Sequence, residues 1–356
     1  MPLASIRVEQ FRCLQQVELT LDPHFNLFVG PNASGKTSLL EALFFLGRGR
    51  SFRTRRLDHL VRQGEKEFMI VGRAAVAGSE PTVLGIRGGR DSTEIRIGGR
   101  PAQGAAELAA FFPPQVIDPE IHKLLEEGPG RRRRFLDWGV FHVEPTFLAT
   151  WQRYHKALRQ RNAALKQELP DSDVEVWNAE LSDAGETLDG QRRAYLARLA
   201  EPLRGMGSRL LGQDVELAYH RGWPEEGGLG EVLERDLGRD RRYRATQHGP
   251  HRADVTVRVA GHRARDRVSR GQQKLLAAGL TLAQVEVQES ERPGQSALLL
   301  DDPAAELDAA NLARLLSCVR DLPVQLMVTS LRADIGGLPE GGQRFHVERG
   351  TITPAA

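Results

Sequence analysis

A stretch of eight residues near the start of the chain has the residue types and spacing of a phosphate-binding loop. It matches the pattern G-x-x-x-x-G-K-[ST] and reads Gly30-Pro31-Asn32-Ala33-Ser34-Gly35-Lys36-Thr37. In such a P-loop the backbone N–H groups point at phosphate oxygens, the lysine reaches the β- and γ-phosphates, and the hydroxyl binds Mg²⁺. The sequence therefore predicts that residues 30–37 hold ATP, with Lys36 on its phosphates and Thr37 on Mg²⁺. A glycine-rich turn that only begins a helix is the structural alternative.

Two consecutive aspartates follow an apolar run late in the chain, Ala297-Leu298-Leu299-Leu300-Asp301-Asp302-Pro303. A buried strand of this kind (a Walker B strand) delivers carboxylates to its C-terminal edge, beside the P-loop. Asp301 is the candidate Mg²⁺ ligand, acting through water. Asp302 stands where ABC ATPases carry a glutamate that polarises the attacking water. Because aspartate is one methylene shorter, slow hydrolysis is expected. The alternative is a strand that ends in a solvated turn.

A third segment, Ser269-Arg270-Gly271-Gln272-Gln273, resembles the ABC signature Ser-Gly-Gly-Gln, with Arg270 in place of the first glycine. Ser269 is a suitable N-cap for the helix that follows, and a helix N-terminus attracts anions. In the ABC class this motif binds the γ-phosphate held by the opposite subunit. Ser269, Gly271 and Gln272 are therefore candidate nucleotide-binding residues. Since each chain carries one P-loop and one signature, we expect ATP to join two chains in a homodimer. A bare N-cap is the alternative.

The elements that must position these residues follow from hydrophobic periodicity. Short apolar blocks before the P-loop are typical of strands, and residues 38–46 have the spacing of a helix. A strand is expected over 68–76. Residues 119–211 have mainly helical spacing, with a helix expected over 147–169, and α/β character returns in the last third. The sequence predicts an α/β fold, an ABC/SMC-type P-loop ATPase head with an inserted helical domain. Its expected parts are 1–118 (first half of the head), 119–230 (the insertion) and 231–356 (second half, with the signature and Walker B).

Composition excludes several classes of protein. The 356 residues are 40% hydrophobic and 27% charged, which is typical of a soluble globular protein, and the formal net charge is only +2. Any nucleic-acid surface would therefore be a local patch. Cys13 and Cys318 give neither a disulfide framework nor a metal-binding spacing. No signal peptide or membrane span is recognisable, so we expect a cytoplasmic protein with no membrane partner.

Six segments together resemble the RecF family of bacterial DNA-repair proteins, which are ABC/SMC-type ATPases. In the family's order they are Phe11-Arg12-Cys13-Leu14, Gly47 to Arg53, Arg131 to Asp137, Gly249 to Asp254, Ser269 to Lys274 and Asp301 to Asp308. Gln115 lies where the resemblance places a Q-loop glutamine, which senses Mg²⁺ and nucleotide. Two departures from the family pattern are Ala33, where glycine is usual, and Ala253 in the His-Arg segment.

This resemblance implies an ATP-dependent DNA-binding protein of recombinational repair and replication. Such a protein would bind single-stranded, gapped or junction DNA and hydrolyse ATP weakly. It would work with RecO and RecR to load the recombinase RecA, and take part in the SOS response. Two alternatives are a transporter-type ABC subunit, whose P-loop and Walker B lie closer together in sequence, and an SMC- or Rad50-like ATPase, which inserts a long coiled coil.

Clusters of arginine allow more than one interpretation. One cluster follows the P-loop helix and either contacts DNA phosphates or forms a solvated face; it comprises Arg48, Arg50, Arg53, Arg55 and Arg56. A second cluster, 131–134, begins a predicted helix, where the helix dipole disfavours cations. Salt bridges to Glu126 and Glu127 are the favoured explanation there. His248 and His251 have no further metal ligands nearby in sequence, so no metal site is expected at them.

Overall fold

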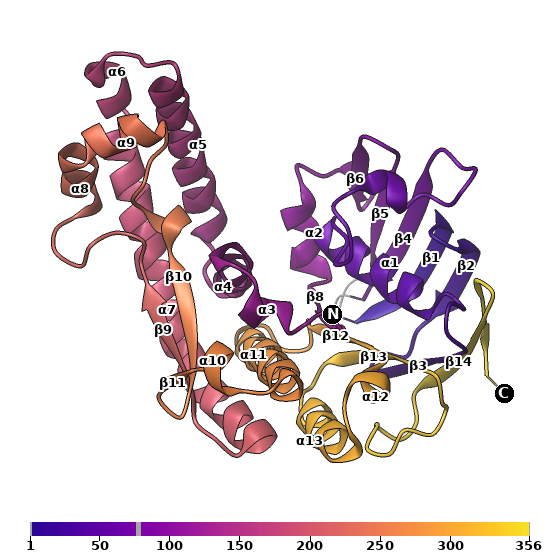
Figure 1. The fold of residues 1–356 in the computed structure, drawn as a ribbon. Coiled ribbons are helices and arrows are strands. Elements are labelled where there is room, and N and C mark those ends of the chain that lie inside the picture. Colours follow the sequence, from indigo (N-terminus) through magenta and orange to yellow (C-terminus); the bar gives the residue numbers. More distant parts are fainter. Residues whose placement is uncertain (1, 76–79, 356) are drawn as a thin grey trace. The chain divides into compact units, whose positions relative to one another are not determined.

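The computed structural model describes residues 2–75 and 80–355. The chain divides into two compact units, each drawn in Figure 1: unit 1 is Met1–Ile121 with Lys274–Ala356, and unit 2 is His122–Gln273. The expected insertion begins close to residue 119, but it ends at Gln273 rather than at residue 230. The reason is that residues 254–259 pair along their whole length with residues 215–220, so this later segment completes unit 2.

Unit 1 contains two six-stranded sheets. The first is antiparallel, in the order β2 (Leu14–Thr20), β1 (Leu3–Phe11), β4 (Phe68–Ala74), β5 (Thr82–Gly88), β6 (Thr93–Ile97) and β7 (Arg100–Pro101). The second is mixed, in the order β15 (Thr351–Pro354), β14 (Gln343–Glu348), β3 (Phe25–Val29), β13 (Gln325–Ser330), β12 (Ala297–Asp301) and β8 (Pro114–Ile117). The short elements η1 (Leu57–His59) and α2 (Ala105–Phe111) complete the N-terminal part.

Helix α1 (Lys36–Arg48) packs against strands of both sheets. It is buried from Ser38 to Gly47 on every side, and within this stretch its residues are apolar or glycine except Ser38 and Glu41. The core of unit 1 therefore joins α1 with the inner faces of the two sheets. Burial of this helix fixes the position of the loop that precedes it.

Five neighbouring strands of the mixed sheet run parallel: β14, β3, β13, β12 and the edge strand β8. Every residue of β12 and β13 is buried, as is typical of parallel strands covered on both faces. Their C-terminal ends meet at one edge, where Asp301 is opposite Thr329 and Ser330 is opposite Val29. The helices α11 (Arg270–Glu291), α12 (Pro303–Glu306) and α13 (Ala309–Arg320) lie in the C-terminal part of the sequence.

Unit 2 is a helical hairpin that packs on a small sheet (Figure 1). Helices α5 (Phe147–Lys166) and α7 (Asn178–Leu211) pack together, and the antiparallel sheet β11-β10-β9 packs on α7 and α4 (Pro129–Val143). The sheet strands are β9 (Val215–His220), β10 (Asp254–Val259) and β11 (His262–Arg263), and the short helices are α3 (Lys123–Glu126), α6 (Asp171–Glu175), α8 (Leu229–Arg235), α9 (Leu237–Tyr243), α10 (Ala264–Arg267) and the 3-10 turn η2 (Pro250–Arg252).

Buried polar contacts hold unit 2 together. The Arg161 guanidinium is fully buried, and its Nη1 lies 2.6 Å from Asp240 Oδ2 and donates to Thr246 Oγ1 at 2.8 Å. Its Nε donates to Asn178 Oδ1 at 2.9 Å. A buried charge of this kind is tolerated because its partners satisfy it, and removal of one partner would cost about 3–5 kcal/mol.

Two of the family-like segments meet inside unit 2. Arg132 makes a bidentate ion pair with Asp254, at 2.8 and 2.9 Å, and Arg133 Nη1 donates to the Ala253 carbonyl at 2.6 Å. Arg131 pairs with Glu127 at 2.8 Å, as the sequence predicts. The segments 131–137 and 249–254 are therefore built into the scaffold of unit 2, and Ala253 takes part through its backbone alone.

Candidate nucleotide-binding site

The P-loop connects β3 to α1 and depends on glycine at two positions. Gly35 has φ = 115°, which favours glycine, and a Cβ on Gly30 would lie 2.1 Å from the Val347 carbonyl oxygen. Ala33 also has positive φ, at 62°. Alanine tolerates this conformation less well than the usual glycine, at a cost of about 1–2 kcal/mol. The Gly350 N–H donates to the Ser34 carbonyl at 2.7 Å and fixes the loop to the β14–β15 hairpin.

The loop presents donors that have no partner within the described chain. No hydrogen bond among residues 2–75 and 80–355 engages the N–H groups of Asn32, Ala33 or Gly35. The Ser34 hydroxyl is likewise buried without a partner in that part of the chain. Lys36 Nζ curls back and donates to the carbonyls of Gly30 at 2.7 Å and Pro31 at 2.9 Å. Burial lowers the pKa of Lys36, while the charges of the two nearby aspartates raise it.

Asp301 lies at the end of β12, directly beside the P-loop. Its Oδ1 accepts hydrogen bonds from the hydroxyls of Thr37 at 2.9 Å and Thr329 at 2.8 Å. The side chain is buried, and burial raises its pKa, while the two hydroxyls and the charges of Arg53 and Lys36 lower it. A buried carboxylate next to a threonine hydroxyl is an oxygen donor set that suits Mg²⁺. Thr329 is a contributor that the sequence patterns did not indicate.

Asp302 has the left-handed conformation, with φ = 46°. Its N–H donates to Thr329 Oγ1 at 3.0 Å, so the same hydroxyl orients both aspartates. Its Oδ1 is buried and has no hydrogen-bond partner among the described residues. Burial raises the pKa of this carboxyl, Lys36 lowers it, and the charges of Asp301 and Glu306 raise it further. Asp302 is therefore a carboxylate with an acceptor oxygen that has no partner among the described residues and with a raised pKa, a direction that favours a general base.

The signature residues lie in unit 2, at the beginning of α11. Gln272 N–H donates to Ser269 Oγ at 3.3 Å, and the Gln272 side chain accepts from Ser269 N–H at 2.9 Å. This reciprocal pair is a capping box, so the serine fulfils its predicted role as N-cap. Residues 269–272 are all exposed, and a Cβ on Gly271 would meet open space. Among residues 2–75 and 80–355, no neighbouring atom therefore requires glycine at position 271.

Gln115 is placed away from the other site residues. It is buried within β8, opposite Leu298 in the register, and its Nε2 donates to Gln284 Oε1 at 3.2 Å. It therefore lies three residues before Asp301 along the parallel strands, roughly 10 Å from the edge where the aspartates lie. The role of Gln115 as a sensor of Mg²⁺ and nucleotide stays a prediction, and the distance of this residue from the aspartates does not support it.

A second feature that the motif analysis missed surrounds Glu41 of α1. This carboxylate is fully buried and pairs with Arg12 at 2.7 Å and with Arg53 at 3.3 Å. The Ser51 hydroxyl also donates to it. Two of the family-like segments, 11–14 and 47–53, thus converge on one side chain of the P-loop helix. Arg48 is held within the fold by a bond from its Nε to the Pro114 carbonyl at 3.0 Å, so it is not a free DNA contact.

The residues at this edge fit both groups that the sequence predicts. Free loop amides, the Ser34 hydroxyl and Lys36 would hold the phosphates of ATP. Thr37 and Asp301 would hold Mg²⁺, which when bound neutralises phosphate charge. The N-terminus of a helix adds a favourable dipole for anions. The hydrogen-bond donors of the loop complement the negative phosphates, and the buried Asp301 carboxylate complements the positive metal ion.

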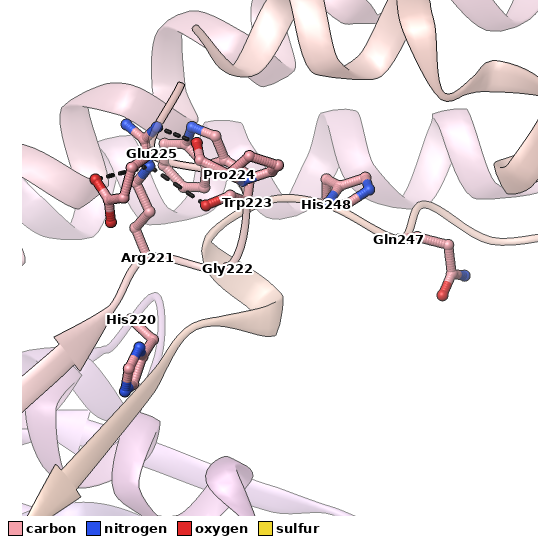
Figure 2. Close-up of a pocket in the computed structure, with 8 residues that line it drawn as sticks. All are labelled: His220, Arg221, Gly222, Trp223, Pro224, Glu225, Gln247 and His248. Carbon is pink, nitrogen blue, oxygen red and sulfur yellow. Dashed lines mark hydrogen bonds and ion pairs between the residues drawn. The ribbon is translucent and has the colours of Figure 1, made fainter. Parts of the chain in front are cut away.

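A hollow of about 500 Å³ elsewhere, within unit 2, has different chemistry (Figure 2). Its main charged group is engaged within the fold: Arg221 stacks over the Trp223 ring at 4.7 Å and donates to the carbonyls of Trp223 and Pro224. The hollow is lined by residues 220–225, 247 and 248, none of which belongs to the motifs above.

Within the described residues, no helix has the length and apolar character needed to cross a membrane.

The mixed sheet, its P-loop and the aspartate-bearing strand define a P-loop ATPase head of the ABC/SMC type. Residues 2–338 match the family described as the RecF/RecN/SMC N-terminal domain. The chain is 41% identical to the DNA replication and repair protein RecF of Pseudomonas fluorescens over 362 residues, covering 99% of this chain and 98% of that protein. RecF of Pseudomonas aeruginosa is 40% identical over the same shares. The chain belongs to the RecF family of DNA replication and repair proteins.

Solved structures agree with that assignment. The recombination mediator protein RecF with ATP, of the RecFOR pathway, is 27% identical, with a TM-score of 0.89 over 100% of this chain and 98% of that chain. An Smc head bound to the C-terminal winged-helix domain of ScpA shares the fold, at a TM-score of 0.59 and 16% identity. The family and the fold class predicted from the sequence are therefore confirmed.

Proposed function

We propose that this chain is a recombination mediator that binds DNA under the control of ATP. The observation that carries the proposal is 41% identity to a DNA replication and repair protein RecF over almost the whole chain, together with an intact assembly of P-loop, Thr37 and Asp301. The relative whose solved structure contains ATP supports the same nucleotide here. By this proposal the ligands are ATP with Mg²⁺, and the DNA is single-stranded, gapped or a junction.

ATP would act by joining two heads. The signature residues Ser269 and Gly271 are exposed, and the open space at Gly271 leaves room for close approach of another surface. One P-loop and one signature per chain suit a dimer in which each head completes the nucleotide site of the other. Asp302 would accept a proton from the attacking water, and slow hydrolysis would then release the dimer. The name of the RecFOR pathway suggests RecO and RecR as partners. The resemblance of the sequence to the RecF family implies RecA loading in the cytoplasm as the outcome.

Sedimentation tests the proposal directly. The parental chain should become a dimer with ATP and Mg²⁺, and this dimer should co-sediment with a gapped duplex. Ser269→Arg should still bind ATP as a monomer, since its P-loop is unchanged, but should not dimerise. A parental chain that neither dimerises with ATP nor binds any DNA would overturn the proposal. Dimerisation of Ser269→Arg would contradict the role of the signature alone.

A further inference from the structure

Five exposed arginines follow one another across a short part of unit 2. They lie on β10, β11, α10 and the first residue of α11: Arg258, Arg263, Arg265, Arg267 and Arg270. We call this set the β10–α10 arginine patch. Residues 258–270 contain a single acid, Asp266, so the segment has a net charge of +4 (five arginines, one aspartate) in a chain whose total is +2. The charge of the molecule is therefore strongly uneven.

The patch differs from the other arginines of unit 2 in its partners. Arg132, Arg153, Arg161 and Arg192 each have a carboxylate within 3.0 Å. Within the described ranges, by contrast, no ion pair joins any of the five patch arginines to a carboxylate. In the part of the chain that the structure describes, the one side-chain hydrogen bond of the patch arginines is from Arg270 to the His122 ring, at 3.5 Å. Five guanidinium groups thus keep most of their donors available.

Two of these arginines are placed against each other. Arg258 and Arg263 are directly opposed in the antiparallel register of β10 and β11, and like charges in that position destabilise a sheet. Glu216 is opposite Arg258 on the other side, so one carboxylate faces two guanidinium groups. The neighbouring helix α3 packs on α10 and contributes Lys123 and Glu126, of which the latter lies 3.7 Å from the His122 ring. The local repulsion would be relieved by a bound polyanion.

The chemistry of the patch selects the kind of polyanion. Guanidinium presents a planar fork that matches phosphate oxygens. An interface with an acidic protein would be expected to include exposed aromatic or apolar anchors. Residues 258–272 contain no Phe, Tyr or Trp, their single ring is the imidazole of His262, and Val268 is only partly exposed. Single-stranded DNA is bound chiefly by successive bases stacked on several aromatic rings, and this segment offers only His262. The phosphate backbone of a duplex needs cations alone.

We propose that the β10–α10 arginine patch binds the phosphate backbone of double-stranded DNA, such as the duplex that flanks a gap. This inference rests on the proposed function, since it assumes that the chain binds DNA, and it assigns one part of that binding to a defined surface. The contact is independent of sequence because it involves no base edge. It also lies next to the signature residue Ser269 in the chain, on the same unit.

The test compares two double variants that each remove two positive charges. Arg263→Gln with Arg267→Gln alters the patch, and Arg239→Gln with Arg242→Gln is the control, on exposed arginines of α9 in the same unit. Binding of a blunt duplex is measured with ATP and Mg²⁺ over a range of salt concentrations. The patch variant should bind on the order of tenfold more weakly, and the slope of log K against log[salt] should fall by about 1–2. The control should keep the parental slope.

A second measurement separates this role from a structural one. Arg263→Gln removes the opposed charge, so thermal unfolding of unit 2 should occur at an unchanged or higher temperature while DNA affinity falls. Arg263→Lys with Arg267→Lys should retain the parental salt slope. If the variant Arg263→Gln with Arg267→Gln no longer forms the ATP dimer, the variant Arg258→Gln is used instead, because Arg258 is the patch residue furthest from Ser269 in sequence.

The outcomes are distinct. If the parental chain and the patch variant bound the duplex equally, the proposal that the patch binds DNA would be overturned, while the proposed function would stay intact. Equal weakening by the control would also overturn it. A parental chain that dimerises with ATP but binds no duplex would remove the patch proposal and the DNA part of the proposed function together.

Discussion

Replacement of Asp302 by asparagine is the sharpest test of the candidate chemistry. The side chains have the same shape, and asparagine tolerates the left-handed backbone that residue 302 adopts at φ = 46°. The hydrogen bond from the backbone N–H of residue 302 to Thr329 does not involve the side chain, so it should persist. What is lost is an acceptor for a proton, at the buried Oδ1 that has no partner in the described residues.

The expected loss follows from the role of a positioned base. Such a group accelerates proton transfer by about 10²–10⁴-fold, which corresponds to about 3–5 kcal/mol of activation free energy. Nucleotide binding should be unchanged, since it depends on Lys36, Thr37 and the loop amides. The pKa of Asp302 is raised by burial, so the parental rate should increase with pH through a value above the ordinary 3.8, as the carboxyl loses its proton. Asp302→Asn should lack that rise.

The assay is single-turnover hydrolysis together with the lifetime of the ATP dimer. Asp302→Asn should bind ATP, dimerise and dissociate slowly. Asp301→Asn is the matched control: it should weaken Mg²⁺-dependent binding itself, because its Oδ1 bonds Thr37. If Asp302→Asn hydrolysed ATP at the parental rate, the reasoning would be refuted. Glu306, which pairs with Lys274, would then be the next candidate.

Three further predictions concern other residues. Lys36→Met should strongly reduce ATP affinity or turnover with the fold intact, and normal hydrolysis by the folded variant would remove the P-loop assignment. Arg161→Met should lower the free energy of unfolding of unit 2 by about 3–5 kcal/mol, because the buried Asp240 would lose its only ion-pair partner among the described residues and keep the hydrogen bond from the Gln247 N–H. Urea unfolding followed by tryptophan fluorescence reports this, since Trp138, Trp151, Trp177 and Trp223 all lie in unit 2. Burial lowers the pKa of His251 to about 4, below its unfolded value of about 6.5, so unit 2 should lose up to about 3 kcal/mol as pH falls from about 6.5 to 4. The His251→Gln variant should show a flatter dependence over that range, and equal curves would contradict the role of this histidine.

The sequence was sufficient for the parts of the site that are local. The P-loop, its helix, the strand that ends at Asp301 and the cap at Ser269 each depend on short-range chemistry, and each is found where the pattern predicts it. The predicted helix over 147–169 is also close to the observed α5, which ends at Lys166. Of the strand expected at 68–76, the structure describes 68–74 as β4, and residue 76 lies outside the described residues.

The parts that could not be predicted depend on contacts between distant segments. Thr329 joins the site only because β13 pairs with β12, and a threonine at the end of a strand carries no signal of its own. Glu41 looked like an ordinary helix residue, yet it collects Arg12 and Arg53. The end of unit 2 was misplaced for the same reason, because β10 reads as a strand of either unit until its partner β9 is known. Hydrophobic periodicity predicts where helices and strands lie in the sequence, but it does not predict which strands pair with one another.

The order of strands in the mixed sheet has a consequence for biosynthesis. Strand β3, which leads into the P-loop, is flanked by β13 and β14, both from the last part of the chain. The ribosome makes β13 roughly 300 residues after the start of β3, a delay of roughly 15–60 s at a synthesis rate of about 5–20 residues per second. Throughout that delay both hydrogen-bonding edges of β3 lack their partners, whereas all of unit 2 is made within the delay and is complete before β13 emerges. We therefore expect unit 2 to fold first, and the nascent N-terminal segment to need protection by chaperones until the final strands close the sheet and shape the ATP site.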